Sequence, residues 1–195
     1  MAQIDTVQLL QDYRAGDALA VELFVRAHQQ VVYRLALSVL DDPAEADEAT
    51  QDSLVAAIGA LDSYRGESAF ATWLYAITLN VCRARLRKRG SRERLIQALH
   101  AIFRLKGETA VHPEETAIKN EAEAAVRQAV NKLDEKHRLP VVLRYYNDFS
   151  IAEIAQLLGI SEGTVHSRLF TARERLRLML RQSVESAHVE NQEAE

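Results

Sequence analysis

The first 90 residues space their apolar positions three and four apart, which is the period of a helix with one buried face. Four helices are expected there, at about residues 4–15, 17–40, 42–61 and 68–90. Asp42 before Pro43 is a helix-start signal, because aspartate caps a first turn and proline fits inside it. A polar loop, 62–68, follows the third helix. The pattern predicts one compact helical bundle.

A second set of helical patterns begins at Glu114, after a segment, 91–113, that we interpret as a linker. Its middle, "LIQALHAIFRL", is apolar enough to form a short helix that packs on its own domains or on a partner. Three or four helices are expected after it, and Pro140 either lies in a first turn or breaks its segment. The polar, acidic end, 182–195, is expected to be disordered.

The stretch "SIAEIAQLLGISEGTVHSRLFTARERLRLML" has the features of a helix-turn-helix. Ser150 and Ser161 are predicted to cap two helices, and Gly159 permits the left-handed backbone of a tight turn between them. One stripe of the second helix must be core: Val165, Leu169, Ala172 and Leu176. The expected fold class is therefore all-α, with two helical domains joined by a linker and a helix-turn-helix in the second domain.

The opposite side of that second helix is polar, basic and aromatic. It carries His166, Ser167, Phe170, Thr171, Arg173 and Arg177. A core gives no reason for an outward Phe170, whereas a thymine methyl group or a sugar would suit it. Hydroxyls reach base edges, and arginines suit phosphate oxygens. An ordinary surface helix with one stray aromatic is the alternative; the coincidence of turn, caps, stripe and arginines favours DNA contact.

Composition limits the kinds of chemistry available to the chain. It has a single cysteine, Cys82, which excludes an internal disulfide and a cysteine-paired zinc site. Neighbouring arginines favour the Cys82 thiolate, but a buried, inert thiol is the preferred interpretation. A phosphate loop, a nucleophile elbow and metal-ligand motifs are absent from the sequence, so we predict neither an enzyme nor a cofactor. No signal peptide or membrane-length apolar run is found, which predicts a cytoplasmic protein without membrane insertion.

Charge is unevenly distributed along the chain. The net charge of -4 argues against a free-standing, high-affinity nucleic-acid binder. Residues 41–52 carry six acids and no base, whereas residues 83–94 carry seven bases and one acid. This asymmetry is typical of a protein with two partners of opposite charge, although two solvated helix faces would give it too. The acids also suit a helix N-terminus.

Over about residues 5–180 the chain resembles the extracytoplasmic-function (ECF) group of bacterial sigma factors. Two stretches carry the resemblance: "EADEATQDSLVAAIGALDSYRGESAFATWLYAITLNVCRARLRKR" and "LPVVLRYYNDFSIAEIAQLLGISEGTVHSRLFTARERLR". The resemblance implies that 1–90 is a sigma region 2 domain, 91–113 a linker like region 3.2, and 114–181 a region 4 domain.

The resemblance also implies a role for each surface. The acidic helix would dock on the β′ clamp coiled coil of RNA polymerase through Asp47, Glu48, Gln51 and Asp52. The minus-ten element would be read, and one of its bases held, by Tyr64, Arg65, Ile77, Asn80, Arg83 and Arg87. The minus-thirty-five element would be read by Thr164, His166, Ser167, Arg168, Phe170, Thr171 and Arg173. His166 departs from the lysine or arginine of many members, and Trp73 is assigned to the core or to a half-buried support.

The implied partners are core RNA polymerase, including its β flap, promoter DNA, and an anti-sigma factor that masks these faces. The free protein is expected to be a monomer that catalyses nothing. A dimeric helix-turn-helix regulator, acting on a palindromic operator without the sigma role, is the alternative. The acidic helix and the "YRGES" loop argue against that alternative.

Overall fold

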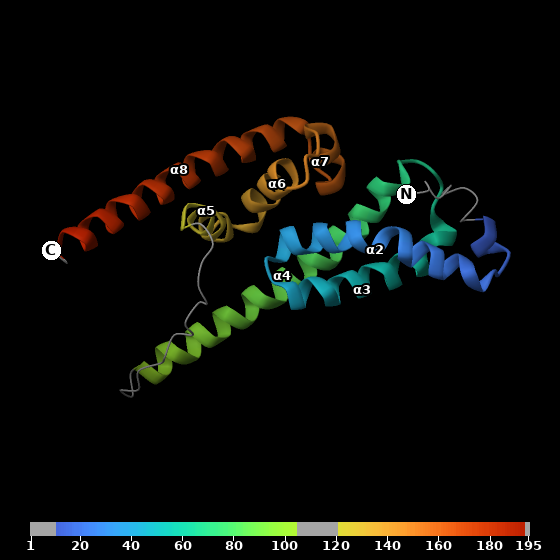
Figure 1. Ribbon diagram of the computed structural model, residues 1–195, viewed down its shortest axis with the longest axis horizontal. Helices are drawn as coiled ribbons and strands as arrows, with labels where there is room; N and C mark the ends of the chain where they lie inside the picture. The colour runs from blue at the N-terminus through green and yellow to red at the C-terminus, as the bar shows by residue number, and fades with distance from the viewer. Residues whose placement is uncertain (1–10, 105–120, 194–195) are drawn as a thin grey trace. The chain divides into compact units, whose positions relative to one another are not determined.

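The computed structural model describes the backbone of residues 11–104 and 121–193, and these residues form helices and no strand (Figure 1). The all-α prediction is confirmed. The chain divides into two compact units, Met1–Thr109 and Ala110–Glu195. We call them unit 1 and unit 2, and each is described by itself.

Unit 1 is built from three long helices and one short one in its described part. They are α2 (Ala18–Leu40), α3 (Pro43–Ala60), the 3-10 helix η1 (Leu61–Ser63) and α4 (Phe70–Arg104). The three long helices all pack against one another. Before them, residues 11–14 are helical and the chain turns at Gly16, as expected for the end of the first predicted helix. The rest of that predicted helix lies outside the described residues.

Aspartates start α2 and α3 as the sequence predicts. The Asp17 carboxylate accepts a hydrogen bond of 2.9 Å from the backbone N–H of Leu19. The Asp42 carboxylate accepts one of the same length from Glu45, and Pro43 occupies the first helical turn. These contacts satisfy backbone donors that have no partner inside the helix.

An aromatic cluster joins the core of unit 1 to the loop before α4. Phe70, at the start of α4, packs edge-on against Phe24 of α2 and against Tyr64 of the loop, with ring centroids 6.2 and 5.2 Å apart. Trp73 lies 5.2 Å from Phe70 and 5.4 Å from Tyr64. The buried residues around this cluster are Ala20, Phe24, Val32, Leu54, Ala57, Leu61, Phe70 and Leu74. The loop is therefore anchored to the bundle by its aromatic side chain.

The helix α4 does not end at the basic run, contrary to the sequence prediction. It continues through Gly90 to Arg104 and includes the apolar stretch that was expected to be a separate short helix. One glycine costs a helix only about 1 kcal/mol relative to alanine, and the leucines, arginines and alanines on both sides are strong helix formers. The remainder of the predicted linker, 105–113, lies outside the described residues.

Unit 2 contains four described helices. They are α5 (Glu121–Asn131), α6 (Glu135–Tyr145), α7 (Ile151–Leu158) and α8 (Glu162–Glu193). The long helix α8 packs against each of the other three. Residues 114–120, where we expected the first helix of this unit to begin, lie outside the described part.

Pro140 lies inside α6 as its sixth residue, so neither sequence expectation for it was correct. Its ring nitrogen cannot donate to the carbonyl of Lys136, and α6 loses one internal hydrogen bond. The side chains around it, Leu139, Val141, Val142 and Leu143, are all buried. Packing of this apolar segment offsets the loss and keeps the helix intact.

The helix-turn-helix has the predicted local geometry. Ser150 and Glu153 form a reciprocal capping box at the start of α7. The chain then turns at Gly159, whose φ of 64° is left-handed, and Ser161 accepts a hydrogen bond from the N–H of Thr164 at the start of α8. The prediction of a capped helix, a glycine turn and a second capped helix is confirmed.

The described helix α8 continues to Glu193, over the segment for which the sequence predicts disorder. From Gln182 to Glu193 the segment has no glycine or proline, and five of its twelve residues are glutamate or glutamine. These are good helix formers, so an existing helix extends through them at little cost.

Alanine at two glycines should change stability in opposite directions. No heavy atom lies within 4 Å of a Cβ added at Gly159 or at Gly90. Gly159→Ala should destabilise unit 2 by about 1 kcal/mol, because a Cβ disfavours the left-handed backbone. Gly90→Ala should stabilise unit 1 by about 0.5–1 kcal/mol, because helical alanine loses less entropy. Urea unfolding of the full chain, followed by circular dichroism and Trp73 fluorescence, measures both; a change of the same sign would contradict the backbone argument.

Candidate nucleic-acid and protein interfaces

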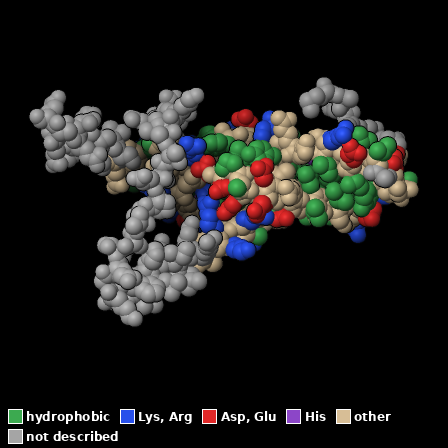
Figure 2. Space-filling model, turned by 60° about the horizontal axis from the view of Figure 1, so that its bottom comes forward, with side chains coloured by type: hydrophobic (Ala, Val, Ile, Leu, Met, Phe, Trp, Pro, Cys, Tyr) green, Lys and Arg blue, Asp and Glu red, His purple; other side chains and the backbone are tan. Residues whose placement is uncertain are grey.

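The acidic run forms the outer face of α3. Figure 2 shows Asp and Glu side chains gathered on one face of the described surface, with Lys and Arg beside them. The predicted docking residues Asp47, Glu48, Gln51 and Asp52 are all exposed. The inner face of α3 consists of small and apolar residues: Ala46, Ala49, Thr50, Ser53, Leu54 and Ala57. We call Asp47, Glu48, Gln51 and Asp52 the acidic face; the helical period places it opposite the core side of α3.

Two buried hydroxyls on the inner face are satisfied within α3 itself. Thr50 donates to the carbonyl of Ala46, and Ser53 donates to that of Ala49. The helix therefore packs closely on its neighbours without needing polar partners from them.

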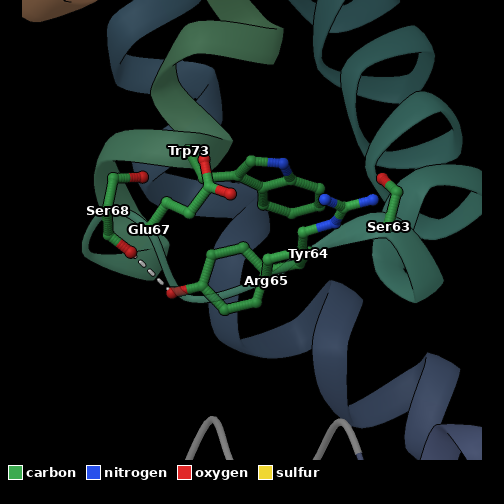
Figure 3. A pocket seen from close by; sticks show the side chains of 6 residues that line it. All are labelled: Ser63, Tyr64, Arg65, Glu67, Ser68 and Trp73. Atoms are coloured by element: carbon green, nitrogen blue, oxygen red, sulfur yellow. Dashed lines mark hydrogen bonds between the residues drawn. The ribbon is translucent and has the colours of Figure 1, made fainter.

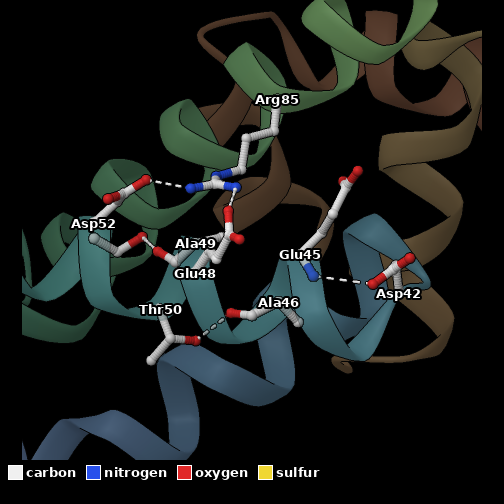
Figure 4. Close-up of polar contacts among 9 residues, drawn as sticks. Asp42, Glu45, Ala46, Glu48, Ala49, Thr50, Asp52 and Arg85 are labelled. Carbon is white, nitrogen blue, oxygen red and sulfur yellow. Dashed lines mark hydrogen bonds and ion pairs between the residues drawn. The ribbon is translucent and has the colours of Figure 1, made fainter.

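Sequence reasoning missed the partner of the acidic face, which is Arg85 of α4. Its Nη1 donates to Oε2 of Glu48 over 2.8 Å, and its Nη2 donates to Oδ2 of Asp52 (Figure 4). The hydrogen bond with Glu48, followed by the one with Asp52, raises the pKa of the Arg85 guanidinium. The only signal in the sequence was that an acidic and a basic run fall on neighbouring helices.

Helix geometry divides the basic run between two sides of α4. Arg83 and Arg87 are one turn apart and share a side, whereas Arg85 points toward α3. Arg83 is half-buried and Arg87 is exposed. Arg89 donates to the carbonyl of Leu40, at the end of α2. Arg85 and Arg89 thus bind neighbouring helices, so the described bases of the run do not form one surface.

The loop before α4 and the start of that helix form a pocket of about 400 Å³. It is lined by Ser63, Tyr64, Arg65, Glu67, Ser68 and Trp73 (Figure 3). The Tyr64 hydroxyl donates to the carbonyl of Ser68 over 2.7 Å, which closes the loop on itself. The rings of Tyr64 and Trp73, tilted by 54° to each other, form the wall, and exposed Arg65 and Glu67 bring both charges to the opening. Such a pocket accepts a flat, polar-edged group.

The structure brings together only part of the predicted minus-ten set. Tyr64 and Arg65 line the pocket, whereas Ile77 is half-buried against the core and Asn80 is exposed farther along α4. Trp73 is half-buried, as expected of a support, but it also lines the pocket. Sequence reasoning left out Glu67 and the two serines, although all three lie in or next to the polar loop that it singled out.

The outward face of α8 agrees with the helical-wheel prediction. Val165, Leu169 and Ala172 are buried, and Leu176 is half-buried. The side chain of Phe170 is 64% exposed. Of the predicted minus-thirty-five residues, His166, Ser167 and Arg173 are exposed, and Thr164, Arg168 and Thr171 are half-buried. Ser167 donates to the carbonyl of Thr164, so its hydroxyl is held close to the helix.

A polar contact that sequence reasoning did not anticipate fixes α8 against α6. Asp134, the cap of α6, accepts hydrogen bonds from His137 and from Arg175 of α8. Burial raises the pKa of Asp134, but hydrogen bonds from His137 and Arg175 outweigh it, and the pKa is lowered overall. The contact ties the start of α6 to the helix that carries the exposed face.

Burial and spacing bear on two other candidate chemistries. Cys82 is fully buried, as expected, and burial raises the pKa of its thiol to about 12 in spite of Arg85. The described residues contain no group of three or more side chains able to hold a metal ion. Among the same residues, no helix is long and apolar enough to cross a membrane.

Comparison with known proteins identifies both halves of the chain. Residues 24–92 match Sigma-70 region 2, and residues 123–176 match Sigma-70, region 4. The RNA polymerase sigma-H factor of Pseudomonas aeruginosa is 34% identical over 180 residues, which cover 89% of this chain and 93% of that protein. The ECF RNA polymerase sigma-E factor of Escherichia coli is 32% identical over 177 residues, covering 88% and 92%. The chain belongs to the ECF sigma factors of the sigma-70 family.

Two solved structures have the same fold as this sigma factor. CnrH, in complex with the cytosolic domain of CnrY, is 27% identical, with a TM-score of 0.60 over 89% of this chain and 96% of that one. The sigma factor RpoE of Bartonella quintana, in complex with the anti-sigma factor NepR, is also 27% identical, with a TM-score of 0.59 over 82% and 96%. Family membership is confirmed, and the dimeric-regulator alternative is not favoured.

Proposed function

We propose that this ECF sigma factor binds core RNA polymerase and directs promoter recognition, DNA melting and initiation at a specific set of promoters. The observation that carries the proposal is the order of two sigma regions along a chain that covers nearly all of its relatives' length. Its partners would be the polymerase and promoter DNA, and it would act in the cytoplasm as a monomer when free. It supplies no catalytic group and needs no cofactor.

Polymerase docking is assigned to the acidic face of α3. Asp47, Glu48, Gln51 and Asp52 are exposed on one helix whose other side is buried, so a partner can meet all four at once. A basic coiled coil of the β′ clamp would complement their charge. The β flap is the expected partner of unit 2.

Minus-ten recognition is assigned to the pocket and to the side of α4 beyond it. An unstacked base would enter between the aromatic wall of Tyr64 and Trp73 and the polar groups of the loop. Asn80 both donates and accepts, so it can contact a neighbouring base edge, and Ile77 would support it. Arg65, Arg83 and Arg87 would bind backbone phosphates, which adds affinity without sequence preference.

Minus-thirty-five recognition is assigned to the exposed face of α8, which would lie in the major groove. Phe170 supplies an apolar contact, and His166, Ser167, Thr164 and Thr171 supply hydrogen-bonding groups. Arg168 and Arg173 would contact phosphates. The departure at His166 is expected to alter base preference at one position.

The mechanism follows from two weak DNA contacts held on one enzyme. Docking on the polymerase fixes the distance between the two DNA-reading units, so the second contact forms at a high effective concentration. Capture of an unstacked base offsets the few kcal/mol of stacking that duplex opening removes. Relatives have been solved in complex with an anti-sigma factor and with the cytosolic domain of CnrY, and we expect such a partner to cover the docking and DNA-binding faces here.

Transcription in vitro from a library of randomised promoters tests the function directly. Core polymerase is assayed with and without the protein, and transcripts are sequenced. We expect transcripts that depend on the protein and that start downstream of two motifs at a fixed spacing. Tight DNA binding without core polymerase, together with no new transcripts, would reject the sigma role and favour the dimeric regulator.

Neutralising the acidic face should separate polymerase binding from DNA binding. Glu48→Gln combined with Asp52→Asn should weaken binding to core polymerase roughly tenfold, because two charges facing a basic partner are lost. The matched control is Glu22→Gln, an exposed acid on α2. Competition for core polymerase against a labelled wild-type protein measures the effect. Equal binding by the double variant and the control would remove the acidic face from the docking surface.

Removing the exposed aromatic of α8 should affect only promoters with an intact minus-thirty-five element. Phe170→Ala should lower initiation roughly fivefold there, because an apolar contact with a base or sugar is lost. Leu178→Ala, on the same helix and 59% exposed, is the matched control. Single-round transcription from paired promoters, with that element intact or scrambled, measures the difference. A loss of the same size on both promoters would place Phe170 outside base recognition.

A further inference from the structure

We propose that Arg85 is a positioning residue for polymerase docking: it holds Glu48 and Asp52 in the arrangement that the partner binds. The inference rests on the docking role proposed above for the acidic face. It assigns to one member of the basic run a role that differs from DNA binding.

The geometry of the contact suits a positioning role. Glu48 and Asp52 lie one helical turn apart on α3, where two carboxylates repel each other. The guanidinium of Arg85 comes from α4 and places one terminal N–H group on each carboxylate (Figure 4). A planar fork of this kind fixes two acceptors at once, which the single ammonium of a lysine cannot do equally well.

The carboxylates remain available while Arg85 holds them. Their side chains are 71% and 58% exposed, whereas that of Arg85 is only 23% exposed. Arg85 uses one oxygen of each, and an ionised carboxylate has a second oxygen that accepts hydrogen bonds. Arg85 therefore lies beneath the acidic face, and an incoming basic partner meets the carboxylates first.

Two effects of Arg85 on docking have opposite signs. Its positive charge lowers the long-range attraction of the face for a basic partner, an effect screened beyond about 8 Å at 0.15 M salt. Its hydrogen bonds order the two side chains before docking, so the complex does not lose that freedom when it forms. At physiological salt we expect ordering to outweigh charge, and the two effects act on different rate constants.

An exposed arginine outside the proposed interfaces provides a matched control. Arg34 of α2 is exposed and belongs to none of the docking or DNA-binding sets proposed above. Arg34→Gln therefore changes net charge as Arg85→Gln does, but leaves Glu48 and Asp52 held.

The experiment measures association and dissociation of the full-length protein with core polymerase at 0.15 M salt. Arg85→Gln should dissociate roughly fivefold faster, with an association rate no lower than wild type, because ordering is lost and repulsion is removed. Arg34→Gln should dissociate at the wild-type rate. Adding Arg85→Gln to the Glu48→Gln, Asp52→Asn variant should not change the dissociation rate further, because the carboxylates that Arg85 holds are already gone. If Arg85→Gln acted only by destabilising the fold, it would raise the dissociation rate in the double variant too.

Each outcome separates this inference from the docking proposal on which it rests. Equal dissociation of Arg85→Gln and Arg34→Gln, while the double acidic variant binds weakly, overturns the role of Arg85 alone. Unchanged binding of the double acidic variant overturns the docking surface itself. If Arg85→Gln unfolds, Arg85→Lys decides: it keeps the charge but not the fork, so dissociation should be roughly twofold faster, and a wild-type rate rejects the proposal.

Discussion

Burial of one phenylalanine ring connects the core of unit 1 to its pocket. Phe70 is buried where α4 begins, and its ring contacts Phe24 of α2, Tyr64 of the loop and Trp73 one turn later. The same ring therefore stabilises helix packing and positions the residues that line the pocket. Because aromatic contacts have preferred geometry, they tie the loop to the bundle. The contacts that stabilise the domain thus also hold the side chains that line the pocket.

Ion pairs within unit 1 show that its acidic and basic runs are not two independent surfaces. Counted along the chain, an acidic run and a basic run suggest two separate surfaces for two partners. In the fold, Arg85 pairs with Glu48 and Asp52, and Arg89 binds the end of α2. The number of arginines available to DNA is therefore smaller than the basic run implies, whereas Glu48 and Asp52 remain exposed. This agrees with a protein that needs the polymerase to hold its DNA-binding units together.

Local rules predicted much of the fold. Asp42, Ser150 and Ser161 cap their helices as expected, and Gly159 adopts the left-handed turn. These features depend on a few neighbouring residues, so a sequence contains enough information to find them. The wheel of α8 likewise predicted exposed Phe170, because burial follows helical period.

The misses arise where tertiary contacts or long helices override a local signal. Pro140 is a helix breaker in isolation, but buried neighbours keep α6 intact around it. Gly90 was taken as a boundary, although strong helix formers on both sides carry α4 past it. The partnership of Arg85 with an acid 37 residues earlier has no periodic signal. Trp73 both packs on the core and lines the pocket, and the second of these roles has no periodic signal either.

The helix α4 is a single, unbroken element of unit 1. Its 35 residues extend about 52 Å at 1.5 Å per residue, from beside the pocket to the point where the segment joining the two units begins. The direction in which the chain leaves this domain is therefore set by the phase of a single helix. Inserting one residue near Gly90 would turn that exit by about 100° and leave the pocket unchanged. The length of α4 is thus a constraint on evolution that acts separately from the identity of any side chain on it.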